Sequence, residues 1–308
     1  MADITWHIEP TSKCILECPL CDRTWFYKKF KKRELHEIDI DHLLNFFEGI
    51  PYQINFCGNN GDPIYHSNFH ELCSRLKQTG CKISITTNGS KKSTAWWEKL
   101  GSILTTTDEI TFSLDGLEDT NKIYRINSDW KSIMNGFNTI KKYSIKTVWK
   151  FIVFRYNQHQ IEEAQKLSKE LGFDEFRLEK SDRWLEEQGL NLKPAEEFVD
   201  NFNIHQLNVL KNKNYKTKMS PGCLINDLPV HQLYIDAEGN FYPCCWMGTY
   251  RYKFKSIFSP KKLNFNIKNY LVNDVLSNND VKKFFQSTKN YESAHDCCKL
   301  QCGVNNNG

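Results

Sequence analysis

The regular alternation of short β-rich runs with helical stretches constrains the fold of this chain more than any other feature. Runs rich in β-branched and aromatic residues recur about every 25 to 35 residues, at 4–10, 52–58, 82–89, 109–116, 147–157 and 173–181. Strands that are joined through helices form parallel sheets with right-handed crossovers. The sequence therefore predicts an α/β fold, a partial (β/α)6 TIM-like barrel, with its site at the carboxyl ends of the strands.

The helical stretches between these runs show the expected periodicity. The clearest spans residues 159–172, where Ile161, Ala164, Leu167 and Leu171 lie on one helical face. This pattern predicts an amphipathic helix that covers the sheet.

The alternation stops after about residue 200, where the chain becomes rich in Asn, Lys, Tyr and Cys. Helical periodicity returns in residues 273–287. We therefore expect two domains, a barrel over residues 1–205 and a small β-hairpin and helix module over residues 206–308.

Composition gives no indication of a membrane or secreted protein. Of the 308 residues, 40% are hydrophobic and 25% are charged, and the formal net charge is +4. The chain has no basic start followed by an apolar run, and no apolar segment approaches the roughly 18 residues of a membrane span. We expect a cytoplasmic protein with no membrane partner, in which the twelve cysteines are thiols or metal ligands.

The cysteines fall into two clusters and a scattered set. The first cluster is Cys14, Cys18 and Cys21. The second comprises Cys223, Cys244, Cys245, Cys297, Cys298 and Cys302, and the scattered set comprises Cys57, Cys73 and Cys81. Cys73 lies among apolar residues at helical spacing, which indicates a core thiol.

The first cluster supplies three ligands within eight residues. A four-iron, four-sulfur cluster takes one thiolate per iron, so three cysteines would leave one iron without a protein ligand. Zinc is the alternative metal, but it requires a fourth ligand, for which only His7 and His36 are candidates.

These residues resemble the radical S-adenosylmethionine (SAM) enzymes, whose signature spaces three cysteines as Cys14, Cys18 and Cys21 are spaced in residues 9–23. Many members carry an aromatic residue before the third cysteine, where this chain has Leu20. The resemblance assigns the three cysteines to a [4Fe-4S] cluster that binds SAM.

Three further segments resemble later motifs of the same family, so the resemblance spans roughly residues 5–180. The first follows the second strand and is similar to the family's Gly-Gly-Glu-Pro segment, with Asp62 in place of Glu; the others end the third and fourth strands. The SAM-contacting residues that this resemblance implies are Gly58, Asn59, Asn60, Gly61, Asp62, Pro63, Thr87, Asn88, Ser113, Asp115 and Arg125.

The resemblance also implies the chemistry. The open iron would chelate SAM, an electron would cleave its sulfonium bond, and the 5'-deoxyadenosyl radical would abstract a hydrogen atom from the substrate. An electron donor such as a flavodoxin or a ferredoxin would then be a partner.

The C-terminal cysteines resemble a twitch domain, the shortened form of the SPASM domain, which holds an auxiliary [4Fe-4S] cluster. That resemblance assigns Cys223, Cys244, Cys298 and Cys302 as ligands, with Cys297 as the alternative to Cys298. A structural four-cysteine zinc site is the competing interpretation.

The substrate is the least constrained part of the prediction. An auxiliary cluster with all four thiolates favours an electron acceptor, and thus an oxidoreductase of the dehydrogenase type acting on a sugar, aminocyclitol or nucleotide. A peptide-modifying enzyme is the alternative, which the start of the chain at the first strand makes less favoured. Basic runs at 28–33, 141–150 and 211–218 suggest nucleic-acid modification as another class, and a non-catalytic metal-binding protein is the last.

Overall fold

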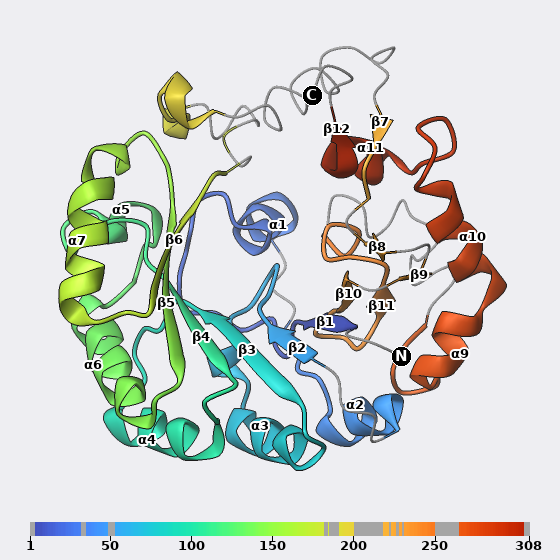
Figure 1. Cartoon of the computed structure of the whole chain (residues 1–308), viewed down its shortest axis with the longest axis horizontal. Helices are drawn as coiled ribbons and strands as arrows, with labels where there is room; N and C mark the ends of the chain where they lie inside the picture. Colours follow the sequence, from blue (N-terminus) through green and yellow to red (C-terminus); the bar gives the residue numbers. More distant parts are fainter. Residues whose placement is uncertain are drawn as a thin grey trace.

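The structure is a computed structural model of the whole chain (Figure 1). It describes residues 4–31, 35–48, 53–181, 184, 191–199, 218–221, 223–225, 228–229, 231–249 and 265–304.

Six parallel strands form the frame of the molecule, in the order in which they occur along the chain. They are β1 (Thr5–Ile8), β2 (Gln53–Phe56), β3 (Lys82–Thr87), β4 (Glu109–Ser113), β5 (Lys146–Ile152) and β6 (Glu175–Glu179). Each neighbouring pair is parallel, and each predicted run overlaps one strand, with β5 beginning one residue before its run. The predicted α/β partial barrel is therefore confirmed.

Helices follow the strands and cover the outer face of the curved sheet (Figure 1). They are α2 (Ile40–Phe47), α3 (Phe69–Gln78), α4 (Thr94–Ile103), α6 (Trp130–Ile140) and α7 (Ile161–Leu171), with the short α5 (Asn121–Tyr124) between β4 and α6. Three of these helices are capped at their N-termini by a side chain that accepts a hydrogen bond from a backbone N–H of the first turn: Asp39 for α2, Ser93 for α4 and Asp129 for α6. The predicted amphipathic helix is α7.

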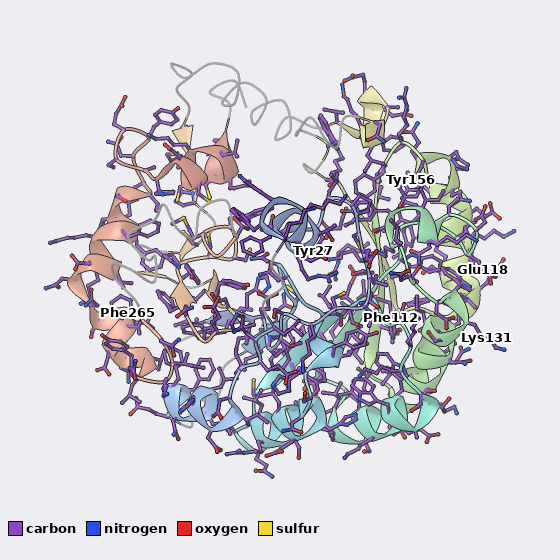
Figure 2. All side chains as sticks on the ribbon, turned by 180° about the vertical axis from the view of Figure 1, so that it is seen from behind. Tyr27, Phe112, Glu118, Lys131, Tyr156 and Phe265 are labelled. Carbon is purple, nitrogen blue, oxygen red and sulfur yellow. The ribbon has the colours of Figure 1, made fainter. Side chains whose placement is uncertain are left out.

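The strands separate an apolar face from a polar one. Phe112 of β4 packs against Trp97 of α4 and Phe137 of α6, and Figure 2 shows it deep among side chains, with Glu118 and Lys131 at the periphery. Because successive side chains on a strand point to opposite faces, their neighbours point to the concave face. That interior face carries polar residues: His7, Asn55, Ser84, Thr111, Ser113 and Lys150.

The C-terminal part extends the same sheet. The predicted hairpin is confirmed as β10 (His231–Ile235) and β11 (Phe241–Tyr242), joined by a turn through residues 236–240. Strand β10 pairs in parallel with β1, with His7 beside Tyr234, so the eight-stranded sheet runs β11-β10-β1-β2-β3-β4-β5-β6. The expected domain boundary at residue 205 lies outside the described residues.

The remaining C-terminal elements are helical or short. They are α9 (Val272–Ser277), α10 (Asn279–Ser287) and α11 (Asp296–Cys302), with the paired strands β7 (Lys218–Met219) and β12 (Gly303–Val304), and β8 (Leu224–Ile225) with β9 (Leu228–Pro229). The helices α9 and α10 confirm the periodicity seen in residues 273–287. Among the described helices, none has the length and apolar character to span a membrane.

Candidate active site

The three-cysteine loop lies at the carboxyl end of β1 and leads into α1 (Asp22–Phe30), with Cys21 as the residue that precedes the helix. The Cys21 backbone N–H donates to the Cys18 carbonyl at 3.1 Å, and the Leu16 N–H donates to the Cys14 Sγ at 3.4 Å. The Arg23 guanidinium donates to the carbonyls of Cys14 and Leu16. The loop is therefore folded around hydrogen bonds to its own backbone.

The loop after β2 contacts the cysteine loop and the end of β3. Its Asn59 carbonyl accepts from the Cys21 thiol at 3.6 Å. The buried Asp62 carboxylate accepts from the Thr87 hydroxyl at 2.8 Å and from the Asn88 backbone N–H at 2.6 Å. The Asn88 side-chain amide reaches the Cys14 Sγ at 3.7 Å. Residues of the first three motifs therefore meet at one point.

The fourth motif, at the end of β4, leads into a segment that also contacts the cysteine loop. Arg125 and Asp115 form a buried ion pair, Nε to Oδ2 at 2.8 Å. Burial opposes the charge on Arg125, but Asp115 raises its pKa above the ordinary value. The Glu17 backbone N–H donates to the Ile126 carbonyl at 3.1 Å, which ties this segment to the cysteine loop. Ser113 is buried at the end of β4.

Sequence reasoning missed Glu9, which lies at the end of β1 and is fully buried. Its carboxylate accepts from the backbone N–H groups of Asn60 and Gly61 at 2.6 and 2.7 Å, and from the Tyr234 hydroxyl at 2.7 Å. Burial raises the pKa of Glu9 despite these donors. The sequence did contain a signal for this residue. Glu9 lies two residues after the polar His7, so both side chains point to the same face of the strand.

The glycines of this loop serve contacts within the protein. A Cβ on Gly61 would stand 1.7 Å from the Thr11 carbonyl oxygen, and a Cβ on Gly58 would stand 2.6 Å from the Glu9 Oε1. Close approach of the loop to β1 therefore requires both glycines.

The donor set of the cysteine loop fits an iron-sulfur cluster. Burial raises the pKa of the Cys14 thiol to about 12, so loading a metal would release its proton. Within the described part of the chain, no three His, Cys, Asp or Glu side chains are already arranged to hold a metal ion. His7, a candidate zinc ligand, contacts the Cys57 thiol through Nε2, and His36 bonds through its backbone to Ser12. The three cysteines of this loop therefore stay the predicted ligands.

The predicted auxiliary ligands lie near one another around α11. Burial raises the pKa of Cys223 to about 12, and the neighbouring Cys244 and Cys302 contribute to the shift. Burial also raises the pKa of Cys298, and the neighbouring Cys244, Cys302 and Cys223 contribute to the shift. Cys297 hydrogen-bonds to Cys244, so both of the alternative ligands lie within reach of the hairpin cysteine.

The structure divides one predicted basic run between different environments. Lys146 pairs with Glu109 and Glu175 at 2.9 and 2.8 Å, whereas Lys150 points to the interior face of the sheet. Residues 211–217 and 32–33 of the other runs lie outside the described residues.

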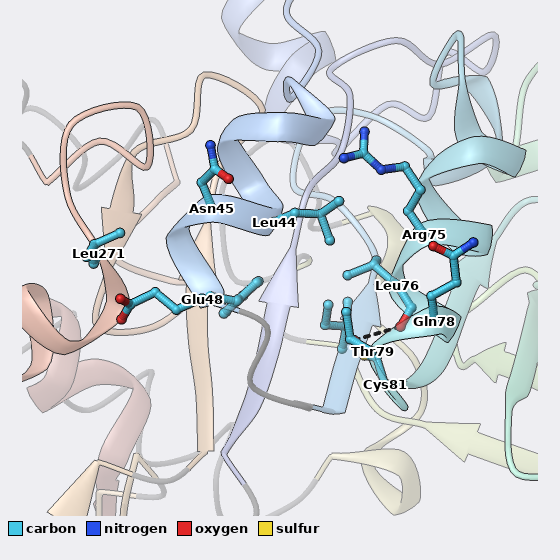
Figure 3. Close-up of a pocket in the computed structure, with 11 residues that line it drawn as sticks. Leu44, Asn45, Glu48, Arg75, Leu76, Gln78, Thr79, Cys81 and Leu271 are labelled. Atoms are coloured by element: carbon cyan, nitrogen blue, oxygen red, sulfur yellow. Dashed lines mark hydrogen bonds between the residues drawn. The ribbon is translucent and has the colours of Figure 1, made fainter.

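A surface pocket lies at the amino ends of β2 and β3 (Figure 3). Its lining includes Glu48 at the end of α2, Thr79 at the end of α3, and Ile54 and Cys81 at the starts of strands. Because the cysteine loop follows the carboxyl end of β1, this pocket is separate from the candidate active site.

Comparison with known proteins identifies the family. The family model described as Radical SAM superfamily matches residues 8–168, which are 161 of the 308 residues. The chain belongs to the radical SAM superfamily. Membership brings a [4Fe-4S] cluster and SAM as cofactors, in agreement with the sequence prediction.

Solved structures agree on the fold. The structure "Native anSMEcpe with bound AdoMet" is 16% identical, with a TM-score of 0.59 over 97% of this chain and 88% of that chain. Streptococcus suis SuiB bound to the precursor peptide SuiA is 14% identical, with a TM-score of 0.64 over 97% of this chain and 70% of that chain. At these identities the similarity shows the fold. No curated protein sequence matches the chain.

Proposed function

We propose that this radical SAM enzyme holds its [4Fe-4S] cluster through Cys14, Cys18 and Cys21 and binds SAM beside it. The observation that carries the proposal is the convergence on the cysteine loop of the segments that follow β2, β3 and β4. These segments lie at the carboxyl ends of neighbouring parallel strands, where a barrel builds its site.

The bound cofactors supply reductive cleavage of SAM and a 5'-deoxyadenosyl radical that abstracts hydrogen. The chain itself supplies position. Asp62 fixes Thr87 and Asn88 through three hydrogen bonds of 2.5 to 2.8 Å, and Glu9 fixes the loop of residues 58–61. The Asp115–Arg125 ion pair holds the segment after β4 against the cysteine loop. The remaining residues assigned by resemblance, Gly58, Asn59, Asn60, Gly61, Pro63 and Ser113, line these same segments.

The finer part of the proposal is an oxidation with a second [4Fe-4S] cluster as the electron acceptor. Cys223, Cys244, Cys298 and Cys302 are its ligands, supported by their proximity to one another around α11 and the end of the hairpin. A small organic molecule, such as a sugar, aminocyclitol or nucleotide, is the substrate class. The electron donor that starts the reaction is a flavodoxin or a ferredoxin.

Modification of a peptide is the second candidate function. Its support is the likeness in fold to SuiB, a structure that contains a precursor peptide. Formation of deoxyadenosine that depends on an added peptide, rather than on a small molecule, would favour this candidate.

The test combines metal analysis with turnover on the same anaerobically reconstituted sample. We expect about eight irons per chain, four for each cluster, and formation of 5'-deoxyadenosine from SAM and dithionite. Replacement of Cys14, Cys18 or Cys21 by Ala should abolish deoxyadenosine formation. The Cys73→Ala variant is the control, because Cys73 is a core residue of α3.

Two results would overturn the proposal. Deoxyadenosine formation at the wild-type rate in a Cys14→Ala variant would show that the loop does not hold the catalytic cluster. Zinc in place of iron, with no deoxyadenosine, would indicate a metal-stabilised binding protein.

A further inference from the structure

Lys150 lies on the interior face of the sheet, on the carboxyl half of β5. Its neighbours in register are Ser113 on β4 and Arg177 on β6. The apolar residues beside it in sequence, Trp149 and Phe151, pack on the opposite, helix-covered face. The strand pattern therefore directs the Lys150 side chain into the hollow of the barrel, on the same side as the ends of the SAM-binding segments.

Other cations on and around this face are neutralised by acids of the chain. Arg125 pairs with Asp115 at 2.8 Å, and Arg177 pairs with Glu175 at 2.8 Å. Lys146, on the same strand, pairs with both Glu109 and Glu175. Each of these acids is thus already used.

Lys150 differs from these cations. Among the residues that the structure describes, its ammonium makes no hydrogen bond and no ion pair, although Cys57, Glu179 and Asp115 are close enough to influence it. Burial lowers the pKa of Lys150, and the positive charge of Arg125 lowers it further. The Lys150 ammonium is thus a partly buried cation that no acid of the described residues contacts directly, so an anion that pairs with it would be favourable.

Two of the groups across the hollow from Lys150 are uncharged at neutral pH. His7 of β1 is neutral, because burial and the charge of Lys150 lower its pKa to about 4. The Cys57 thiol, which contacts His7, has a pKa raised to about 12 by burial. The charge of Lys150 thus acts across the hollow on His7 of β1 and is close enough to influence Cys57 at the end of β2, and both are uncharged hydrogen-bonding groups.

We propose that Lys150 binds an anionic group, a carboxylate or a phosphate, of a substrate held on the interior face beside the SAM site. The inference rests on the proposed function for the identity of the bound molecule as the substrate. An anion in this position would pair with the ammonium, which no acid of the described residues contacts directly. The neutral His7 and Cys57 would face the rest of the same molecule.

The anion that pairs with Lys150 could also belong to SAM, because SAM itself carries a carboxylate. The experiment therefore uses inorganic phosphate as the probe on the reconstituted enzyme, once without SAM and once with the enzyme saturated in SAM. Anaerobic labelling with acetic anhydride is followed by mass spectrometry of each lysine. Because only the neutral amine is acetylated, an anion that pairs with the ammonium slows the reaction.

We expect phosphate to slow acetylation of Lys150 about tenfold relative to chloride at equal ionic strength, in the presence of SAM as well as in its absence. Lys146 is the internal control, because its ammonium already pairs with Glu109 and Glu175 and should not respond. Protection by SAM alone that decarboxylated SAM does not reproduce would assign Lys150 to the SAM carboxylate and overturn the proposal. Absence of any protection by phosphate would also overturn it.

Calorimetric binding of phosphate to variants gives a second measurement. Lys150→Gln should weaken phosphate binding about tenfold, whereas Lys150→Arg, which keeps the charge, and Lys146→Gln should bind as the wild type does. Iron content equal to that of the wild type establishes that each variant is folded. Unchanged phosphate binding in Lys150→Gln would refute the site.

Neither readout needs turnover. An enzyme that protects Lys150 with phosphate but forms no deoxyadenosine would refute the proposed function and leave the anion site standing. The reverse pattern would refute only the anion site.

Discussion

Buried polar residues at this site are divided by what they contact. The carboxylate oxygens of Asp62 and Glu9 accept hydrogen bonds from other residues of the chain, and these bonds hold the loops together. His7 and Lys150 face the hollow of the sheet with few direct partners. The first pair therefore explains why the loops adopt their shape, and the second pair is available to a bound molecule.

The buried His7 should make stability depend on pH in a measurable way. Its folded pKa of about 4 lies below the ordinary 6.5, so between these values the unfolded chain binds a proton that the folded chain does not. The free energy of unfolding contributed by this group therefore falls as pH decreases through that window, by about 1.4 kcal/mol per pH unit. Cys57, Lys150 and Tyr234 are the titratable groups that face it.

The measurement is the difference in urea unfolding free energy between wild type and His7→Gln, from pH 7.5 to pH 5.5. We expect this difference to change by about 1 kcal/mol, with the wild type losing more stability at low pH. Subtraction removes the contributions of Glu9 and Asp62, whose pKa values burial raises in both proteins. A difference that is constant with pH would contradict the prediction.

Among the elements, the loop after β2 has the tightest packing requirement. Replacement of Gly61 by Ala would place a methyl group 1.7 Å from the backbone oxygen of Thr11, which cannot move without displacing β1. We expect Gly61→Ala to destabilise the protein by about 2 kcal/mol or more and to weaken SAM binding, since the loop loses its hydrogen bonds to Glu9.

Thermal unfolding and SAM binding by equilibrium dialysis check this expectation. Ser102→Ala on the exposed face of α4 is the control and should leave both quantities unchanged. A Gly61→Ala protein with wild-type stability would show that the loop does not need its close approach to β1.

The sequence predicted those features that local patterns determine. Each β-rich run became a strand, because alternating apolar residues have one helix-covered face to occupy, and the turn at residues 236–240 formed the hairpin. Pairing of β10 with β1 was not predicted, because the two strands are more than 220 residues apart and no local pattern encodes a partner. The Asp115–Arg125 pair and the role of Glu9 were missed for the same reason, since each depends on segments that meet only in the folded chain.

Helix α11 bears on the choice between two neighbouring cysteines. Residues four apart lie on the same face of a helix, so Cys298 and Cys302 share a face of α11, while Cys297 lies on an adjacent one and contacts Cys244. We expect Cys298→Ala and Cys223→Ala to lose about half of the iron, and Cys297→Ala to retain it. Iron and sulfide analysis after anaerobic reconstitution gives the answer. Loss of half the iron in Cys297→Ala, with Cys298→Ala at the wild-type level, would exchange the two assignments.

At the scale of the whole molecule, the two ends of the chain share one sheet. Strand β10 hydrogen-bonds alongside β1, and the Asn59 side chain donates to the Cys245 carbonyl at 2.9 Å. Glu9 completes the connection, because a single carboxylate accepts from the loop after β2 and from Tyr234 of β10. The C-terminal strand and the cysteine segment that follows the hairpin are thereby linked to the loop after β2.

A double-mutant cycle of Glu9→Gln and Tyr234→Phe measures this link. The hydrogen bond of 2.7 Å is fully buried and its acceptor is a carboxylate, so we expect a coupling of about 2 kcal/mol in the free energy of unfolding. If the bond also positions the loop, both single variants should weaken SAM binding, although Tyr234 is absent from the SAM-binding segments. If the hydrogen bond links the two segments, the losses of stability in the two single variants must be interdependent. Losses that simply add in the double variant would show that the C-terminal strand packs on β1 without controlling the site.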